Sequence, residues 1–141
     1  MAGAPDFDEI AETFELLDDW EERYRYVIDL GKGLPGLPEA LRTPQTKVEG
    51  CASQVWIAPE IREEGGVKRL FFEGDSDAHI VRGLIAVLKA LLSGRPVAEI
   101  AVSEPIEDFA RLGLDAHLSP QRSNGLRAMV ERLKRLASAA T

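Results

Sequence analysis

The spacing of apolar residues changes twice along this chain of 141 residues, and the change limits the folds open to it. Toward both ends, apolar residues recur every three or four positions, as on one face of a helix. Between residues 54 and 73 they follow a strand-like pattern, in two segments joined by the turn at residues 63–66. A hairpin with one apolar face needs helices to cover it. The sequence therefore predicts an α+β fold, with a small three-stranded antiparallel sheet packed against several helices.

Each expected element has a sequence signal. The helices are expected at residues 8–17, 20–30, from about 78 to 93, 104–112, and from Ser119-Pro120 onward. The strands are expected at residues 47–49, 54–61 and 67–73. Asp75, Ser76 and Asp77 are candidate caps for the third helix. Residues 31–44 are rich in glycine and proline, which predicts a loop with one turn near residues 39–41.

Composition narrows the class of protein. The chain is long enough and apolar enough, at 45% hydrophobic residues, for one globular domain spanning residues 1–141. Its longest apolar runs fall short of the roughly 20 residues that a membrane span needs. A net charge of −7 argues against binding nucleic acid. Residues 1–8 lack the pattern of a secretory signal, so we expect a cytoplasmic protein whose thiol stays reduced.

The charges are unevenly distributed. Nine acidic residues and no basic one lie between Asp6 and Glu22. The last predicted helix is basic, with only Glu131 as an acid against Arg122, Arg127, Arg132, Lys134 and Arg135. Two interpretations stay open: these are solvated helix faces, or the basic helix is a docking surface for an acidic protein partner.

The chain has one cysteine, Cys51. A lone thiol forms no internal disulfide and supplies too few ligands for a structural zinc or an iron–sulfur cluster, so no metal or cofactor is expected. Cys51 falls between two strand-like segments, which places it at a loop tip where Gly50 gives backbone freedom. Ser53 and Gln54 can tie that loop down. From spacing alone, Cys51 is either a small buried apolar residue or a single nucleophile or carrier.

The segment Gly50-Cys51-Ala52-Ser53-Gln54-Val55-Trp56 resembles the loop that carries the sulfur-accepting cysteine of SufE-type proteins. Further similar segments run in the same order through nearly the whole chain, at residues 19–24, 28–31, 43–45, 48–57, 74–78, 80–87, 117–120 and 122–126. Ala52 occupies a site that is often glutamine in the family, and that position looks tolerant of change.

The resemblance implies a sulfur relay with the SufE/IscU-like fold. A pyridoxal-phosphate-dependent cysteine desulfurase of the SufS or CsdA type would hold sulfur as a persulfide. The Cys51 thiolate would take the outer sulfur, stimulate the desulfurase and pass the sulfur toward a SufBCD-like assembly scaffold. The chain itself would then be a carrier and activator rather than an enzyme.

The resemblance also assigns expected roles to residues around Cys51. Arg122 would lie near the cysteine loop and the desulfurase interface, where it favours the thiolate or pairs with a partner carboxylate. The alternative interpretation is that Arg122 is simply an exposed arginine at the start of a helix. Asp75 and Asp77 either cap a helix or lie close to the cysteine loop. His79 and His117 have no spacing that places them beside Cys51 as a catalytic base.

Three other functions compete with the carrier. A cluster scaffold of the IscU type shares this general fold but needs several thiol ligands. A thiol enzyme such as a hydrolase or peroxidase needs a base or an arginine beside Cys51. An interaction adaptor would not need Cys51 at all. The identity of the desulfurase, the final sulfur recipient, the thiol pKa and the oligomeric state, a homodimer included, stay open.

Overall fold

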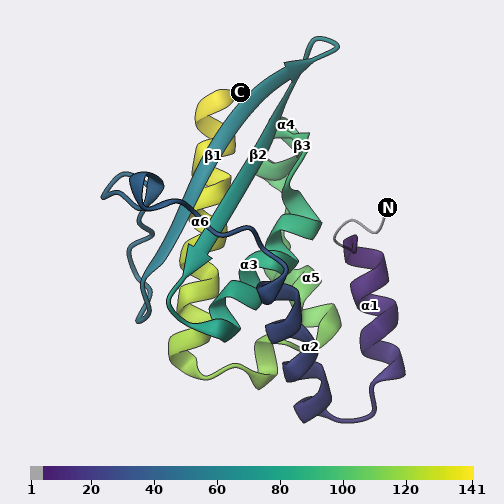
Figure 1. Cartoon of the computed structure of the whole chain (residues 1–141). Helices are drawn as coiled ribbons and strands as arrows, with labels where there is room; N and C mark the ends of the chain where they lie inside the picture. Colours follow the sequence, from purple (N-terminus) through teal and green to yellow (C-terminus); the bar gives the residue numbers. More distant parts are fainter. Residues whose placement is uncertain (1–4) are drawn as a thin grey trace.

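The computed structural model describes residues 5–141 and has the predicted α+β architecture. Residues 1–4, part of the segment inspected for a secretory signal, lie outside the described residues. The elements are α1 (Phe7–Leu16), α2 (Trp20–Lys32), η1 (Glu39–Leu41), β1 (Val55–Glu64), β2 (Val67–Ser76), α3 (His79–Leu92), β3 (Arg95–Pro96), α4 (Val97–Val102), α5 (Pro105–Leu112), η2 (Asp115–His117) and α6 (Pro120–Ala140). Figure 1 shows β1 and β2 as one long hairpin whose tip extends beyond the helices.

The hairpin turns where the sequence predicts a turn. Val67 pairs with Glu64, and the two residues between them, Gly65 and Gly66, have φ angles of 60° and 79°. Positive φ at both central residues is the geometry that matches the twist of a two-residue hairpin, and glycine adopts it without strain. The pairing continues to Val55 opposite Ser76, so β2 is longer than the predicted strand at 67–73.

The third strand is not the predicted one. The sheet has the order β1-β2-β3, and the third strand is Arg95–Pro96, which pairs with Leu70 and Arg69 of β2. Gly94, with a φ of 91°, turns the chain back after α3 and donates its N–H to Leu70 O at 2.7 Å. The predicted strand at 47–49 forms only an isolated bridge, from Lys47 to Trp56 of β1. After this bridge the chain turns away from β1 to form the cysteine loop.

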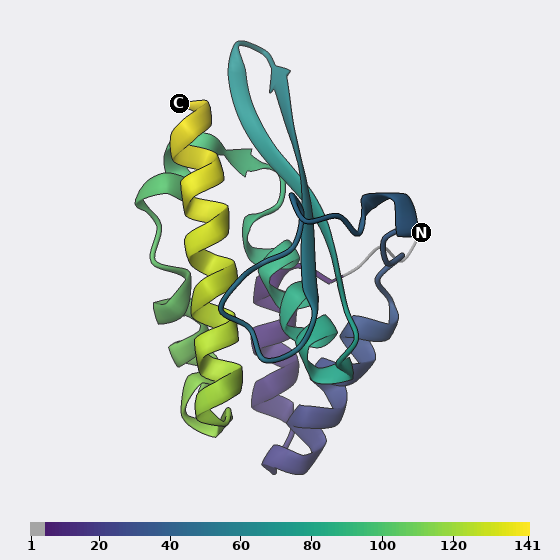
Figure 2. The same cartoon turned by 90° about the vertical axis from the view of Figure 1, so that its left-hand side faces the viewer.

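The core lies between the inner face of the hairpin and the helices. Leu70 and Phe72 share the buried face of β2, as predicted, and Phe71 lies half-buried on the other face. In both views α6 runs alongside the hairpin (Figures 1 and 2). Fully buried side chains from the helices complete the core, including Leu84, Leu88, Ile100, Leu126, Met129 and Leu133. Helix α4 was not predicted, because a helix of six residues with two buried side chains gives little periodic signal.

Helices α2 and α3 pack unusually close together because glycines face each other at their contact. A Cβ added to Gly83 would lie 2.3 Å from Val27 O, and one added to Gly31 would lie 2.5 Å from Gly83 N. Gly31 was predicted to end its helix, but α2 continues to Lys32 and is capped at Gly33. The glycine at position 31 therefore serves packing rather than termination.

Asp75 ties the long loop after α2 to the end of β2. Its buried carboxylate accepts hydrogen bonds from Leu37 N–H at 3.0 Å and Ser76 N–H at 2.8 Å, and from Arg42 Nη2 at 2.7 Å. Arg82 Nε lies 3.4 Å from Oδ1, the oxygen that accepts from Ser76. Asp75 therefore anchors the loop, and it does not cap α3 as predicted. The N-cap of α3 is Ala78, which has no side-chain hydrogen bond. Strand β2 runs on through Ser76 and includes Asp75, and the Asp77 carboxylate accepts from Gln54 N–H instead.

Burial alone would raise the pKa of the Asp75 carboxyl. The hydrogen bonds from Leu37, Ser76 and Arg42, together with the charge of Arg82, outweigh that effect and hold the pKa below its ordinary value. The ionised form is therefore favoured in the folded state. Its contribution to stability is present above the unfolded-state pKa of about 3.9 and is lost as the pH falls through the lower folded-state pKa.

We expect Gly83→Ala to lower the free energy of unfolding by about 2–3 kcal/mol, because the added methyl group forces α2 and α3 apart. Denaturant unfolding measures this directly. Gly33→Ala is the matched control: Gly33 has a φ of −79° and its added Cβ would meet no atom closer than 3.4 Å. A Gly83→Ala protein as stable as the control would contradict the close helix contact.

We expect Asp75→Asn to lower the free energy of unfolding at pH 7 by about 2 kcal/mol, since it leaves buried donors with a neutral partner. The difference from the unsubstituted protein should shrink as the pH falls from the unfolded-state pKa of about 3.9 toward the lower folded-state pKa of Asp75, because the unfolded wild-type chain binds a proton there before the folded carboxylate does. Asp29→Asn removes an exposed pair with Lys32 and is the control, with an expected change within about 0.5 kcal/mol. A deficit that is independent of pH would show that the charge of Asp75 is not what stabilises the fold.

Candidate functional site

The cysteine loop, residues 49–54, connects two segments that are hydrogen-bonded to each other: the arm at residues 45–48, which leads into the loop, and the start of β1. Val48 N–H donates to Val55 O at 2.8 Å, and Ile57 N–H donates to Thr46 O at 2.8 Å. Both Val48 and Val55 are buried, which fixes the base of the loop in the core. The prediction that Cys51 lies at a loop tip is confirmed.

Asp77 fixes the end of the loop that leads into β1. Its Oδ1 accepts a hydrogen bond from Gln54 N–H at 3.0 Å, and its own N–H donates to Gln54 O at 3.3 Å. Asp77 thus lies beside the cysteine loop, the second of its two expected positions, and it is not a helix cap. Asp75, two residues earlier, bonds to the Gly33–Arg42 region instead.

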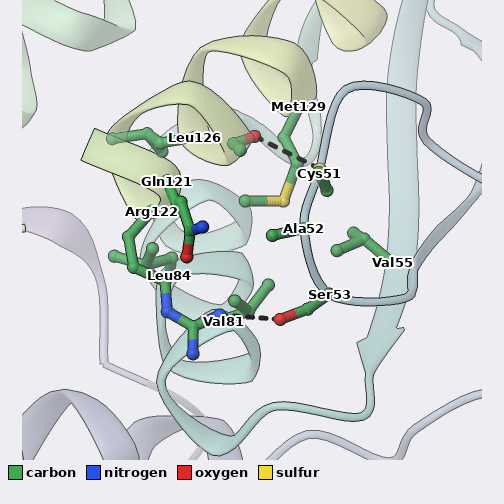
Figure 3. A pocket seen from close by; sticks show the side chains of 11 residues that line it. Cys51, Ala52, Ser53, Val55, Val81, Leu84, Gln121, Arg122, Leu126 and Met129 are labelled. Carbon is green, nitrogen blue, oxygen red and sulfur yellow. Dashed lines mark hydrogen bonds between the residues drawn. The ribbon is translucent and has the colours of Figure 1, made fainter. Parts of the chain in front are cut away.

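Cys51 packs against the N-terminal half of α6 (Figure 3). Its Sγ lies 3.7 Å from Gly125 O, and a Cβ added to Gly125 would lie 3.6 Å from the same sulfur. Gly50 reaches the helix one turn later, where an added Cβ would lie 3.3 Å from the Ala128 side chain. Its φ of 90° is in the range that favours glycine. The sequence around Cys51 therefore fits the loop closely onto α6.

Two arginines of α6 bond to the loop and the arm before it. Arg122 Nη1 donates to Ser53 Oγ at 2.7 Å, so Arg122 is half-buried beside the loop rather than an exposed arginine at a helix start. Arg132 donates to the backbone carbonyls of Lys47, at 3.1 Å, and Gln45. In the sequence Arg132 is one of several basic residues of the last helix, and nothing in its spacing marks these bonds.

A small cavity of about 10 Å³ opens beside Cys51, with room for about one water-sized atom. Most of its wall is apolar, and Arg122 and Gln121 lie at one side (Figure 3). The apolar side chains come from three separate elements: Val55 of β1, Val81 and Leu84 of α3, and Leu126 and Met129 of α6.

Burial raises the pKa of the Cys51 thiol, and the Glu49 carboxylate raises it further. This direction is opposite to the one expected if Arg122 favoured the thiolate in the closed loop. At neutral pH the thiol is therefore largely protonated, and a protonated thiol is a weak nucleophile.

The other candidate groups lie elsewhere. Neither histidine lines the cavity; His117 stacks on Trp20, with ring centroids 3.7 Å apart, which gives it a structural role. Within residues 5–141, no group of three or more histidine, cysteine, aspartate or glutamate side chains could hold a metal ion. In the same range, no helix has both the length and the apolar character that crossing a membrane requires.

The basic residues of α6 divide into two groups. Arg122 and Arg132 bond to the loop segment, and Lys134 lies 3.8 Å from Glu104 of the same chain. Arg127 and Arg135 are exposed and form no ion pair within residues 5–141. If α6 is a docking surface, the second of the two open interpretations, these two arginines can contribute to it without breaking an ion pair or hydrogen bond within residues 5–141.

Comparisons with known proteins identify the family of this chain. The SufE family, described as "Fe-S metabolism associated domain", matches residues 8–137. An uncharacterized SufE-like protein of Rhizobium etli is 55% identical over 127 residues, covering 90% of this chain and 86% of that protein. A second, from Rhizobium meliloti, is 51% identical over 90% of this chain and 91% of its own length.

A solved structure supports the fold. The solution structure of a hypothetical protein from Thermus thermophilus matches with a TM-score of 0.71 and 23% identity, covering 99% of this chain and 98% of that one. With a family match over nearly the whole chain and relatives above half identity, this chain belongs to the SufE family, whose domain is associated with Fe–S metabolism.

Proposed function

We propose that this protein accepts sulfur on Cys51 from the persulfide of a SufS- or CsdA-type cysteine desulfurase and relays it to iron–sulfur cluster assembly. The observation that carries the proposal is the setting of Cys51, at a loop tip beside an apolar cavity with room for about one further atom. A persulfide adds one sulfur atom to the thiol, so the site can shelter the product.

The transfer is a thiol–persulfide exchange. The Cys51 thiolate attacks the outer sulfur of the desulfurase persulfide, the sulfur–sulfur bond in the desulfurase breaks, and its thiolate leaves. Cys51 loses one proton, the desulfurase cysteine regains one, and the sulfane sulfur moves without net oxidation or reduction. By clearing the desulfurase thiol, the acceptor raises desulfurase turnover.

The closed loop favours storage over attack. The raised pKa of the thiol keeps Cys51 weakly reactive in the free protein. The packing of the loop on α6 limits the access of small reductants to the sulfur atom. Reaction with the desulfurase persulfide requires the loop to leave α6. We propose that Arg122, released from Ser53 in that movement, then pairs with a carboxylate of the partner.

The competing functions have less support. A cluster scaffold would need ligands beyond Cys51, and residues 5–141 contain no cluster of metal-binding side chains. A thiol hydrolase would need a base, and neither His79 nor His117 lines the cavity around Cys51. A peroxidase would need an arginine beside Cys51, and Arg122 does line the cavity, but it donates to Ser53 and the pKa of the thiol is raised, not lowered. An interaction adaptor predicts that Cys51 is dispensable, which a substitution decides.

We expect Cys51→Ser to abolish stimulation of a SufS-type desulfurase while leaving binding unchanged. Serine keeps the size of the side chain, so the free energy of unfolding should stay within about 1 kcal/mol of the unsubstituted value. The measurements are sulfide release from cysteine and affinity by calorimetry. Val102→Ser, at an exposed position of α4, is the control that should stimulate normally.

Unimpaired stimulation by Cys51→Ser would exclude the carrier mechanism and favour an adaptor. If Cys51→Ser were unstable, Cys51→Ala would replace it, since the half-buried position accepts a smaller apolar side chain.

A further inference from the structure

Arg132 makes two hydrogen bonds to the arm that leads into the cysteine loop. From the C-terminal half of α6, its guanidinium donates to the carbonyls of Lys47 and Gln45. Arg122, ten residues earlier in the helix and so about 15 Å away along its axis, donates to Ser53 in the loop. The two arginines therefore attach the cysteine segment to α6 at both of its ends.

The backbone pairing of the arm explains why the carbonyl of Lys47 is free to accept. Thr46 O and Val48 N–H face β1 and bond to Ile57 and Val55. Lys47 forms the bridge to Trp56, and successive peptide groups of such a segment point to opposite sides, so the carbonyl of Lys47 points away from β1. Gln45 lies in the turn that precedes this bridge. A guanidinium presents several N–H donors in a planar fork, which suits two neighbouring acceptors.

The polar contact that Cys51 itself makes with α6 is weaker. Cys51 Sγ lies 3.7 Å from Gly125 O, and a thiol is a poor hydrogen-bond donor. The arginine bonds involve a charged donor, and such bonds contribute more than neutral ones. Arg132 supplies two of the three, at the arm that leads into the cysteine loop.

We propose that Arg132 is a positioning residue that holds the Cys51 loop closed on α6 and so sets how often the thiol is exposed before a partner docks. The effect of Arg132 on sulfur transfer rests on the proposed function. Its effect on thiol exposure concerns the free protein only, and can be measured without a desulfurase.

The test is the rate of Cys51 alkylation by iodoacetamide in the free protein, followed by intact mass. Because Cys51 is the one cysteine of the chain, each protein molecule gives a single mass shift. We expect Arg132→Met to react faster by about ten-fold or more, since it loses two charge-assisted hydrogen bonds. Arg132→Lys should fall in between, because an ammonium group lacks the planar fork.

Arg135→Met is the matched control, an exposed arginine of the same helix that forms no ion pair within the described residues. Its rate should stay within about two-fold of the unsubstituted protein. Repeating the series at low urea concentrations separates local from global opening. Exposure through a local loop movement is nearly independent of urea, whereas exposure through global unfolding rises with it.

A faster, urea-independent rate for Arg132→Met, with partial restoration by lysine, supports the proposal. An unchanged rate overturns it, as does an increase that tracks urea, which would mean that Arg132 stabilises the whole fold instead. None of these outcomes depends on sulfur transfer, so the proposed function and the role of Arg132 can fail separately.

Discussion

The apolar face of the β1–β2 hairpin must be covered by helices, and the position of Cys51 depends on how they cover it. Helices α3 and α6 contribute buried side chains opposite Ile57, Leu70 and Phe72. The chain that enters β1 must then pass over the N-terminal half of α6, where the cysteine loop meets Gly125 and Ala128. One packing requirement thus builds the core and places the thiol against a helix (Figure 3).

The same contact creates a compromise between protecting and using the thiol. A cysteine that lies against apolar side chains is sheltered, but burial raises its pKa and slows attack. A permanently exposed loop would react faster and would lose a persulfide faster. A loop held by a few side-chain bonds to α6 can meet both demands, since docking has only to replace those bonds.

Local signals predicted most of the fold because they depend on residues close in sequence. The helix periodicity, the Gly65-Gly66 turn and the buried pair Leu70 and Phe72 all lie within one or two elements. The wrong predictions concern residues whose contacts come from segments far away in the sequence. Asp75 reads as a helix cap in sequence, but its partners Leu37 and Arg42 lie more than thirty residues earlier.

For the site, too, local signals were predictive and long-range contacts were not. The sequence motif located Cys51 and its loop, and the family resemblance placed Arg122 near it. The bond from Arg122 to Ser53 spans 69 residues, and those from Arg132 to Lys47 and Gln45 span 85 and 87. No spacing rule connects residues so far apart, and Arg132 stands among several similar basic residues. The raised pKa of Cys51 likewise follows from packing, which composition does not reveal.

The most direct test of the central claim is peptide mass spectrometry after mixing this protein with a SufS-type desulfurase, pyridoxal phosphate and cysteine. Sulfur carriage predicts one added sulfur atom, about 32 Da, on the peptide that contains Cys51, and none when the desulfurase is omitted. A Cys51 peptide that stays unmodified beside an active desulfurase known to load such acceptors would contradict sulfur carriage by this thiol.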